Sequence, residues 1–431
     1  MSDLTIALVL VGLLSIASQF VAYSVKLPAI LFLLLAGIFV GPVTGVLDAD
    51  LLFGDLLFPV VSLSVAIILF EGALTLKFSD ISGHGNMVRN LCSIGVVVTW
   101  FIVTPLAYFF LDISLGLAAL FAAIITVTGP TVIVPMLRTV RPKGSVANIL
   151  RWEGIIIDPI GALFAVLVFE YLLTQQDAFS HTLAAFGWTL ASGSLFGVST
   201  GYFLGLSIRN NWLPHYLKNT AVLTIILAAF AISNLLAHES GLLTVTIAGM
   251  MLANMRGVEV DDILEFKETL SVLLISGLFI LLATRIDFAA IAEVGFEALI
   301  VVIGVLFVAR PISVFVSSIG TGISFNERLL LSWIAPRGIV AAAVSALFSL
   351  RLEEKGFEQA GILVPLVFLI IISTVVVQSL TATKVAEWLK LREPEPTGFL
   401  IFGANDFSRA LSLELTNNNI PSLIADPNWD A

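Results

Sequence analysis

Residues 126–135 have the sequence TVTGPTVIVP and lie in the middle of an apolar run that is long enough to cross a lipid bilayer. Proline has no backbone N–H and its ring collides with the preceding helical turn, so Pro130 and Pro135 are expected to unwind this helix. Pro336 interrupts a second apolar run in the same way, in WIAPRGIV at residues 333–340. Backbone groups that are freed in hydrocarbon are costly unless protein buries them or they line a cavity. The two stretches therefore predict two broken helices inside a membrane protein.

The overall composition also indicates a membrane protein. Of the 431 residues, 58% are hydrophobic and 12% are charged, and the mean hydropathy is +1.04. Soluble domains carry about 25% charged residues, so an ordinary soluble enzyme is excluded. The net charge of −10 argues against nucleic acid as a partner. The single cysteine, Cys92, leaves no disulfide framework or cysteine-based metal site, and no pattern indicates a cofactor.

Apolar runs between charged or Gly/Pro-rich breaks predict an all-α polytopic membrane protein with thirteen transmembrane helices. The first run continues directly into a second one, so we expect a membrane helix there and not a separate signal peptide. The predicted spans are 4–24, 27–47, 57–77, 88–111, 114–137, 146–173, 181–208, 219–237, 241–256, 265–284, 291–319, 327–349 and 360–388.

The distribution of Lys and Arg predicts the orientation of the chain in the membrane, because these residues accumulate in cytoplasmic loops. If the N-terminus is outside, fifteen of them fall on the cytoplasmic side and only Arg285, Arg351 and Lys355 fall outside. Arg310 and Arg337 fit neither side and are expected within the membrane. The pattern predicts a multi-pass plasma (inner) membrane protein with its N-terminus outside and its C-terminus in the cytoplasm.

The two broken helices are the fifth and twelfth spans, so they run in opposite directions. Each is the fifth helix of a block of six if the seventh helix is a spacer. This spacing is expected of six-helix inverted repeats, whose broken helices cross near the membrane midplane at the substrate site of secondary transporters. The N-termini of the half-helices would leave positive dipole ends there, which an acidic side chain could neutralise. For either break alone, an ordinary proline kink is the alternative.

The sixth span, NILRWEGIIIDPIGALFAVLVF at residues 148–169, contains two acidic residues, Glu153 and Asp158. An ionised Asp at the bilayer centre costs ~2.5–3.5 kcal/mol, so Asp158 is expected to have a role. A carboxylate in such apolar surroundings can hold a proton or a monovalent cation, but not comfortably both. The alternative for Asp158 is a structural ion pair with an intramembrane arginine.

Glu153 lies five positions before Asp158 and points about 140° away from it on a helix, so the two carboxylates do not share a face. A buried charge needs a counter-charge. Glu153 is therefore expected to pair with an intramembrane arginine and to tie span six to span eleven or twelve.

Other polar residues are candidates for ion contact. Glu71, in LFEGAL at residues 69–74, lies toward the cytoplasmic end of span three, where ion contact and a snorkelling glutamate at a cavity mouth are both open. Hydroxyls and freed carbonyls beside the first break could ligate an alkali cation, at Thr126, Thr128 and Thr131. The four histidines are expected to be surface residues because none has a second ligand at metal spacing: His84, His181, His215 and His238.

Five motifs, in this order, resemble those of the monovalent cation/proton antiporters, most closely the NhaP-type and animal sodium/proton exchanger branch. They are LFEGAL, TVTGPTV, EGIIIDP, the VAR that ends at Arg310, and APRGIV around Arg337. The resemblance covers about residues 5–390. It implies thirteen helices, a homodimer, and a core domain that moves against a dimerisation domain.

The resemblance also implies roles for individual residues. Asp158 corresponds to the ion-binding aspartate, with Thr128 beside it. Glu153 and Arg310 correspond to a structural ion pair, and Arg337 to the arginine at the break of span twelve. Three polar residues that are usual in this branch, an asparagine, an aspartate and a serine, are replaced here, so potassium is an alternative to sodium: the replacements are Ile157, Gly129 and Gly154.

Residues 1–392 are expected to form the transmembrane antiporter domain, with interleaved core and dimerisation subdomains, and residues 393–397 a proline-containing linker. The remainder predicts a β-α-β unit in GFLIFGAN, DFSRALSLELTNN and IPSLIAD. A unit of ~34 residues cannot bury a core alone, so 398–431 is expected to be an incomplete Rossmann-like fragment of a larger domain. It resembles the start of a TrkA-N/RCK-like nucleotide-binding regulatory domain. Asn405 and Ser408 stand where further glycines are expected, and a nucleotide is expected only if the domain is complete.

The sequence therefore predicts a secondary antiporter and not an enzyme. Its substrates would be H⁺ and a monovalent cation, Na⁺ or possibly K⁺ or Li⁺, exchanged by alternating access around Asp158 in the lipid bilayer. A single titrating carboxylate predicts electroneutral exchange. Two alternatives are a nucleotide-regulated cation channel, for which no selectivity-filter motif is visible, and an anion symporter, for which Asp158 would be unfavourable.

Overall fold

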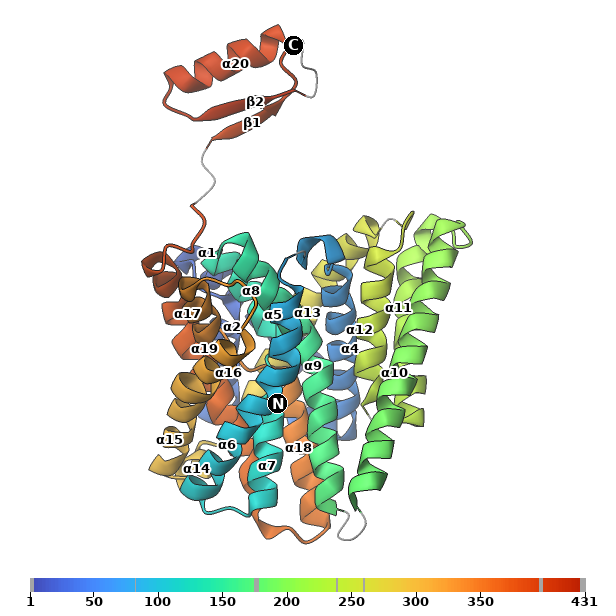
Figure 1. Ribbon diagram of the computed structural model, residues 1–431, viewed down its shortest axis with the longest axis vertical. Coiled ribbons are helices and arrows are strands. Elements are labelled where there is room, and N and C mark those ends of the chain that lie inside the picture. The colour runs from blue at the N-terminus through green and yellow to red at the C-terminus, as the bar shows by residue number, and fades with distance from the viewer. Residues whose placement is uncertain are drawn as a thin grey trace. The chain divides into compact units, whose positions relative to one another are not determined.

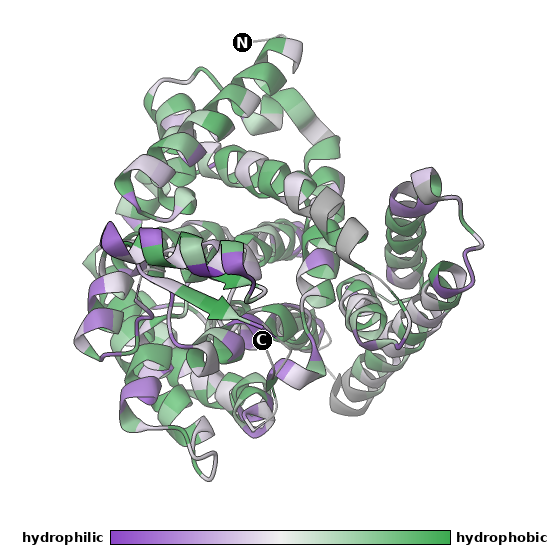
Figure 2. Cartoon of the chain, turned by 90° about the horizontal axis from the view of Figure 1, so that it is seen from above, coloured by the Kyte–Doolittle hydropathy of each residue, from purple (hydrophilic) through white to green (hydrophobic). Residues whose placement is uncertain are grey.

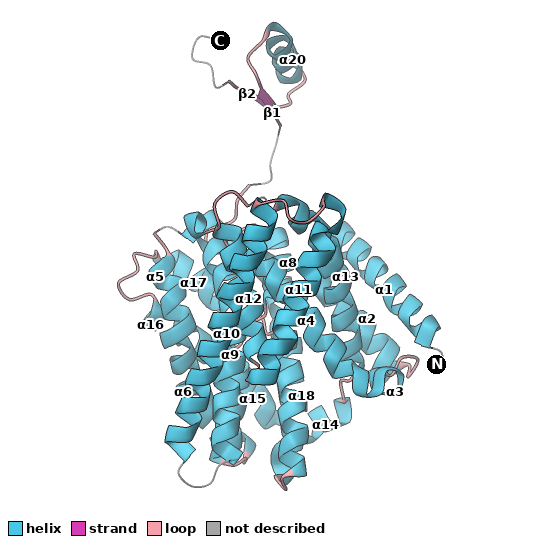
Figure 3. Cartoon of the chain, turned by 90° about the vertical axis from the view of Figure 1, so that its right-hand side faces the viewer, coloured by secondary structure: helices cyan, strands magenta, loops and turns pink. Residues whose placement is uncertain are grey.

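The computed structural model describes residues 4–81, 83–173, 178–237, 239–258, 260–394 and 398–426. The chain divides into two compact units, Met1–Leu391 and Arg392–Ala431. The first unit is a bundle of helices and the second is a small β-α-β unit, which holds the two described strands (Figures 1 and 3).

The helices of the bundle follow one another with short connections. The first ten are α1 (Leu4–Val25), α2 (Ala29–Ile38), α3 (Ala49–Phe53), α4 (Leu57–Leu74), α5 (Gly85–Asn90), α6 (Val96–Leu111), α7 (Leu115–Ile125), α8 (Pro130–Val140), α9 (Gly144–Leu173) and α10 (Ala178–Arg209). The remaining ones are α11 (His215–Leu236), α12 (Ser240–Asn254), α13 (Asp261–Thr284), α14 (Phe288–Glu293), α15 (Phe296–Gly304), α16 (Arg310–Ser317), α17 (Phe325–Trp333), α18 (Ile339–Glu354) and α19 (Leu363–Trp388). Single π-helical turns, Leu91–Gly95 and Val305–Ala309, join α5 to α6 and α15 to α16 into continuous segments.

Many of these helices have the length and composition of membrane spans. Among the described residues, seven helical segments are long and apolar enough to cross a membrane, or eight when one bent pair is counted as a single span. Hydrophobic residues cover most of the helices, including those at the periphery of the bundle (Figure 2). The prediction of a helical protein with several membrane-spanning segments is therefore confirmed.

The first predicted break lies between α7 and α8, whose axes are bent by 44°. Residues 126–129 are not helical, and Pro130 is the first residue of α8, where a missing N–H removes no intrahelical bond. The prediction that Pro135 also unwinds the segment was wrong, because Pro135 lies inside α8. Because Pro135 has no N–H, the Thr131 carbonyl lacks the donor that it would have in a regular helix.

The second predicted break lies between α17 and α18, where residues 334–338 are not helical. A capping box starts α17: the Ser324 hydroxyl accepts from the Glu327 N–H, and the Glu327 carboxylate accepts from the Ser324 N–H. The chain is helical in α17 before Pro336 and in α18 after it, and is unwound only at residues 334–338.

A row of glycines lets α10 approach α12 closely. Gly193, Gly197, Gly201 and Gly205 recur at every fourth position of α10 and face α12. A Cβ atom on Gly197 would lie 2.8 Å from the Thr244 carbonyl oxygen, and no real Cβ atom fits there. Small residues at such spacing are typical of tightly packed membrane helices.

The C-terminal unit has the predicted β-α-β order. Its elements are β1 (Phe399–Phe402), α20 (Asp406–Asn417) and β2 (Ser422–Ala425). The strands pair in parallel, with Phe399 opposite Ser422. The Asn405 side chain caps α20 by accepting from the Ser408 N–H. Residues 395–397 of the predicted linker lie outside the described residues.

Candidate ion-binding site

The two breaks touch each other. The Gly129 N–H donates to the Pro336 carbonyl oxygen over 3.3 Å. A Cβ atom on Gly129 would lie 2.5 Å from the Cα atom of Gly338, and one on Gly338 would lie 2.6 Å from the Cα atom of Gly129. Both positions therefore need glycine for the unwound backbones to cross at this distance.

Arg337, in the second break, holds the end of the first half-helix. Its Nη1 atom donates to the carbonyl oxygens of Thr126 and Val127, each over 3.3 Å. These carbonyls follow the C-terminus of α7, which carries the negative end of the helix dipole. The buried guanidinium group thus satisfies acceptors that the broken helix leaves open.

Two polar side chains of α19 hold the second break. The Gln378 side-chain oxygen accepts from the Ala335 N–H over 3.1 Å, and the Thr374 hydroxyl oxygen accepts from the Arg337 N–H over 3.3 Å. Neither residue is among the candidates predicted from the sequence. An amide such as Gln378 in an apolar span is itself a signal, because a buried polar group needs a hydrogen-bond partner.

The face of α9 that carries Asp158 packs against the first break. Gly154, Asp158 and Gly161 stand at positions i, i+4 and i+7 and so share one helical face. A Cβ atom on Gly154 would lie 2.8 Å from the Ile133 side chain of α8, and one on Gly161 would lie 2.5 Å from the Val127 side chain in the break. Asp158 lies between these two contacts and therefore faces the break.

Several buried side-chain oxygens at the first break have no hydrogen-bond partner among the described residues. Asp158 is 1% exposed, and neither of its carboxylate oxygens has a hydrogen-bond partner in the described part of the chain. The same holds there for the buried hydroxyls of Thr128 and Thr131. By contrast, the Thr126 hydroxyl donates to the Ala123 carbonyl oxygen over 2.7 Å. Buried oxygens without partners are costly, so their grouping at one break makes it a candidate site for a proton or a cation.

Glu153 and Arg310 form a two-pronged ion pair inside the bundle. Arg310 Nη2 donates to Glu153 Oε2 over 2.9 Å, and Nη1 pairs with the other carboxylate oxygen. Arg310 also donates to the carbonyl oxygens of Leu331 and Ile334, at the start of the second break. The pair therefore links α9 and α16 to the end of α17. The Glu153 carboxylate in this pair is the one expected to point away from Asp158 on α9.

Glu71 lies in the wall of a cavity of ≈390 Å³. The Ser271 hydroxyl of α13 donates to its carboxylate. Arg138 and Arg151 line the same cavity, which extends to Pro130 at the first break. The cavity leads from one end of the bundle toward the crossing, and Glu71 is the acidic residue among its described lining residues.

Two of the four histidines stand at helix starts among the described residues. His84 precedes α5, and His215 is the first residue of α11. His238 lies outside the described residues, and nothing is described for the His181 side chain.

Two unwound helices that cross beside a buried carboxylate are the arrangement of membrane transporters with broken helices. The chain belongs to the sodium/hydrogen exchanger family, because the family model for the transmembrane sodium/hydrogen exchanger matches residues 6–388.

Several known proteins are similar to this chain. The Na(+)/H(+) antiporter NhaH of Halobacillus aidingensis is 26% identical over 347 residues, which are 77% of this chain and 83% of that protein. The K(+)/H(+) antiporter NhaP of Alkalimonas amylolytica is 23% identical over 403 residues, which are 92% of this chain and 69% of that protein. The structure of the sodium proton antiporter MjNhaP1 from Methanocaldococcus jannaschii at pH 8 has a TM-score of 0.77 and 23% identity, covering 90% of this chain and 97% of that one. That likeness shows a shared fold.

Proposed function

We propose that this protein exchanges a monovalent cation for a proton across a membrane by alternating access around Asp158. One observation carries the proposal: a fully buried carboxylate without a hydrogen-bond partner among the described residues faces the crossing of two broken helices. A carboxylate left in this state is unfavourable unless a proton or a cation neutralises it.

The proposed cycle uses oxygens that the fold leaves available. Deprotonated Asp158 binds the cation, together with the hydroxyls of Thr128 and Thr131. Pro135 and Pro159 have no N–H, so the carbonyls of Thr131 and Ile155 lack their usual helical donor and could add ligands. The core then shifts, the cation leaves, and a proton takes its place. Because one charge moves in each direction, the membrane potential does not drive the exchange.

The buried arginines have positioning roles in this proposal. Arg337 joins the end of α7 to the second break, and the Glu153–Arg310 pair joins α9 to the same break. The two breaks would therefore move together with Asp158 as one rigid body. We further propose the thirteen-span inverted repeat, the N-terminus outside, and a homodimer, in keeping with the sequence analysis.

The proposed cation is Na⁺, with K⁺ as the alternative. Similar proteins are named for either ion. Ile157, Gly129 and Gly154 provide no polar side chain at positions where this branch usually has one. Selectivity would then depend on Asp158, two hydroxyls, backbone carbonyls and water.

The test is the dissipation of a pH gradient in proteoliposomes when Na⁺, K⁺ or Li⁺ is added separately, with and without valinomycin and K⁺ to clamp the potential. The wild-type protein should dissipate the pH gradient to the same extent with and without the clamp, and Asp158→Asn should abolish the signal. Glu293→Gln, which neutralises an exposed carboxylate on α14, is the matched control and should keep full activity. Full activity of Asp158→Asn would refute the assignment.

A further inference from the structure

Three polar residues of α19 share one helical face, at positions i, i+4 and i+7: Thr374, Gln378 and Thr381. Their oxygens accept, in the same order, from the Arg337 N–H, the Ala335 N–H and the Trp333 indole N–H, the last over 2.9 Å. We call these three residues the α19 ladder. The ladder thus binds every second residue from the end of α17 into the second break.

The spacing of the ladder matches an extended backbone. Ile334 and Gly338, which bound the unwound stretch, both have extended φ and ψ angles. Two residues of extended chain rise about 6.6 Å, and four residues of helix rise about 6 Å. Thr374 and Gln378 are therefore spaced to hold two alternate N–H groups of one extended segment.

The unwound stretch is held along both of its edges. Alternate residues of an extended chain direct their backbone groups to opposite sides. The α19 ladder binds the N–H groups of one edge. On the other edge, the Ile334 carbonyl oxygen accepts from Arg310, and the Pro336 carbonyl oxygen accepts from the Gly129 N–H of the first break. The ladder therefore fixes the position from which the second break meets the first.

The ladder residues that bind backbone N–H groups are buried, and the hydroxyl is oriented. Thr374 and Gln378 are each 1% exposed. The Thr374 hydroxyl donates to the Ile370 carbonyl oxygen of its own helix over 2.8 Å, so its lone pairs are left to accept from the Arg337 N–H. A buried N–H that loses its acceptor is destabilised, so each oxygen fixes the N–H that it binds.

The first break is treated differently by the helix that follows it. Like α19, α9 follows a broken span and presents residues at positions i, i+4 and i+7 to it, but these are Gly154, Asp158 and Gly161. The Asp158 oxygens bind no group in the described part of the chain. Helix α19 thus holds its break with side-chain oxygens, whereas α9 leaves its carboxylate available.

We propose that the α19 ladder positions the crossing for ion binding, with Gln378 as its central positioning residue. The ladder fixes the second break. The Pro336 carbonyl and the Arg337 guanidinium group then fix the first break, which Asp158 faces. The effect on transport rests on the proposed exchange function, whereas the positioning of the two breaks does not.

Cation titrations in proteoliposomes test the effect on transport. Gln378→Met and Thr374→Val keep the approximate size of the side chains and remove the oxygens that bind the break. Each should raise the cation concentration for half-maximal dissipation of the pH gradient about tenfold, because the breaks are displaced. Thr374→Ser keeps the hydroxyl and should behave like the wild type. A contact that only stabilised the fold would lower the melting temperature without changing this concentration.

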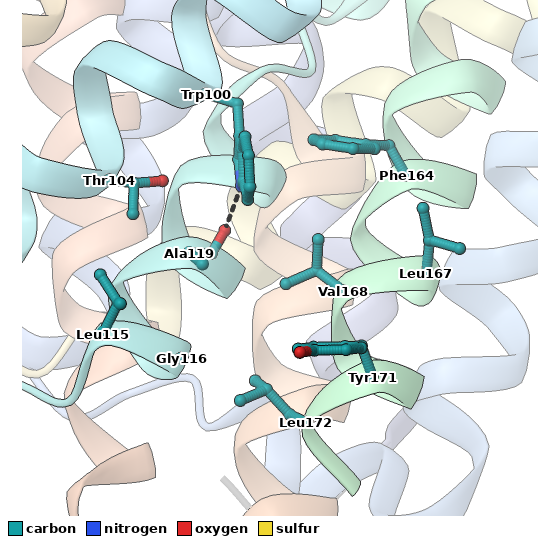
Figure 4. Close-up of a pocket in the computed structure, with 10 residues that line it drawn as sticks. All are labelled: Trp100, Thr104, Leu115, Gly116, Ala119, Phe164, Leu167, Val168, Tyr171 and Leu172. Carbon is teal, nitrogen blue, oxygen red and sulfur yellow. Dashed lines mark hydrogen bonds between the residues drawn. The ribbon is translucent and has the colours of Figure 1, made fainter. Parts of the chain in front are cut away.

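Two variants outside the ladder are controls. Ser379→Ala removes a buried hydroxyl of α19 that has no hydrogen-bond partner within the described ranges, so exchange and melting should stay unchanged. Trp100→Phe removes the hydrogen bond from the α6 indole to the Ala119 carbonyl oxygen of α7, 2.8 Å long, beside a cavity of ≈550 Å³ (Figure 4). It should lower the melting temperature and leave the half-maximal cation concentration unchanged.

A double-mutant cycle on melting temperature in detergent tests the positioning without transport. The losses of Gln378→Met and Gly129→Ala should be less than additive, because both displace the same contact between the breaks. The losses of Gln378→Met and Gly197→Ala, on α10, should add. Thr374→Val takes the place of Gln378→Met in both cycles if the latter does not fold.

Two results would overturn the proposal. They are additive losses with Gly129→Ala, or an unchanged half-maximal cation concentration in both Gln378→Met and Thr374→Val. A wild-type chain that exchanges no cation would contradict the proposed function alone, and the cycle would still decide whether the ladder positions the breaks.

Discussion

Gly129 and Gly338 touch across the two broken helices, with no side chain between them. The contact is backbone on backbone, and one hydrogen bond from Gly129 to Pro336 accompanies it. One glycine lies in each break. Because neither has a Cβ atom, the two backbones can approach to this distance. Asp158 faces the first of these breaks, so the geometry of its surroundings depends on this contact.

Replacing Gly129 should therefore push the breaks apart. Gly129→Ala places a methyl group where only 2.5 Å is available, and overpacking of this kind costs ~1–3 kcal/mol. We expect a lower melting temperature in detergent and a loss of ion exchange in proteoliposomes. Gly144→Ala is the control, because nothing lies within 4 Å of its new methyl group. If Gly129→Ala melts and transports like Gly144→Ala, the close crossing does not matter.

The sequence predicted the breaks because proline and glycine act locally. Pro130 and Pro336 interrupt their helices through their own rings, and no tertiary contact is needed to foresee this. Pro135 was predicted wrongly because an internal proline can remain within a helix, and whether it does depends on the packing around it. The predicted thirteen spans and their repeat symmetry remain proposals.

Partners across the bundle could be predicted only by chemical type. Burial of Glu153 demanded a positive partner, for which charge alone left Arg310 and Arg337 as candidates. The family resemblance implied Arg310, and the arrangement of α9 and α16 brings Arg310 to Glu153. Thr374 and Gln378 were missed: the buried amide of Gln378 is a signal that a partner exists, but the sequence does not show that the partners are backbone N–H groups of the second break. The glycine row of α10 has the spacing of a close helix contact, but only the structure identifies α12 as the helix that it meets.

Breaking the Glu153–Arg310 pair should strongly destabilise the fold. Glu153→Gln leaves a buried guanidinium group without its counter-charge, which costs ~3–5 kcal/mol. Arg310→Met leaves the carboxylate buried and also removes the bonds to Leu331 and Ile334. The melting temperature of the double variant should fall by less than the sum of the two single effects. Additive losses in this double-mutant cycle would show that the two side chains do not interact.

The glycine row of α10 provides a matched pair of substitutions on one helix. Gly197→Ala directs a methyl group at the Thr244 carbonyl and the Ile247 side chain, so α10 and α12 must separate and the melting temperature should fall. Gly187→Ala has open space around it and should be neutral or slightly stabilising, because alanine favours the helix by up to about 1 kcal/mol. Equal effects at the two positions would mean that helix propensity, and not close packing, decides the outcome.

Glu239, in the turn between α11 and α12, should make stability depend on pH. Burial raises the pKa of its carboxyl group above the ordinary value of 4.5, and the charge of Arg351 opposes this only in part. The folded state therefore binds the proton more tightly than the unfolded state, and the free energy of unfolding falls as pH rises through the raised pKa. Glu239→Gln should melt at a higher temperature than the wild type above that pKa, and the difference should vanish below 4.5. Melting curves of the wild type and Glu239→Gln, recorded from below pH 4.5 to above the raised pKa, measure the effect. Glu293→Gln, which changes an exposed carboxylate, is the control. A variant that is less stable than the wild type at neutral pH would show that ionised Glu239 stabilises the turn.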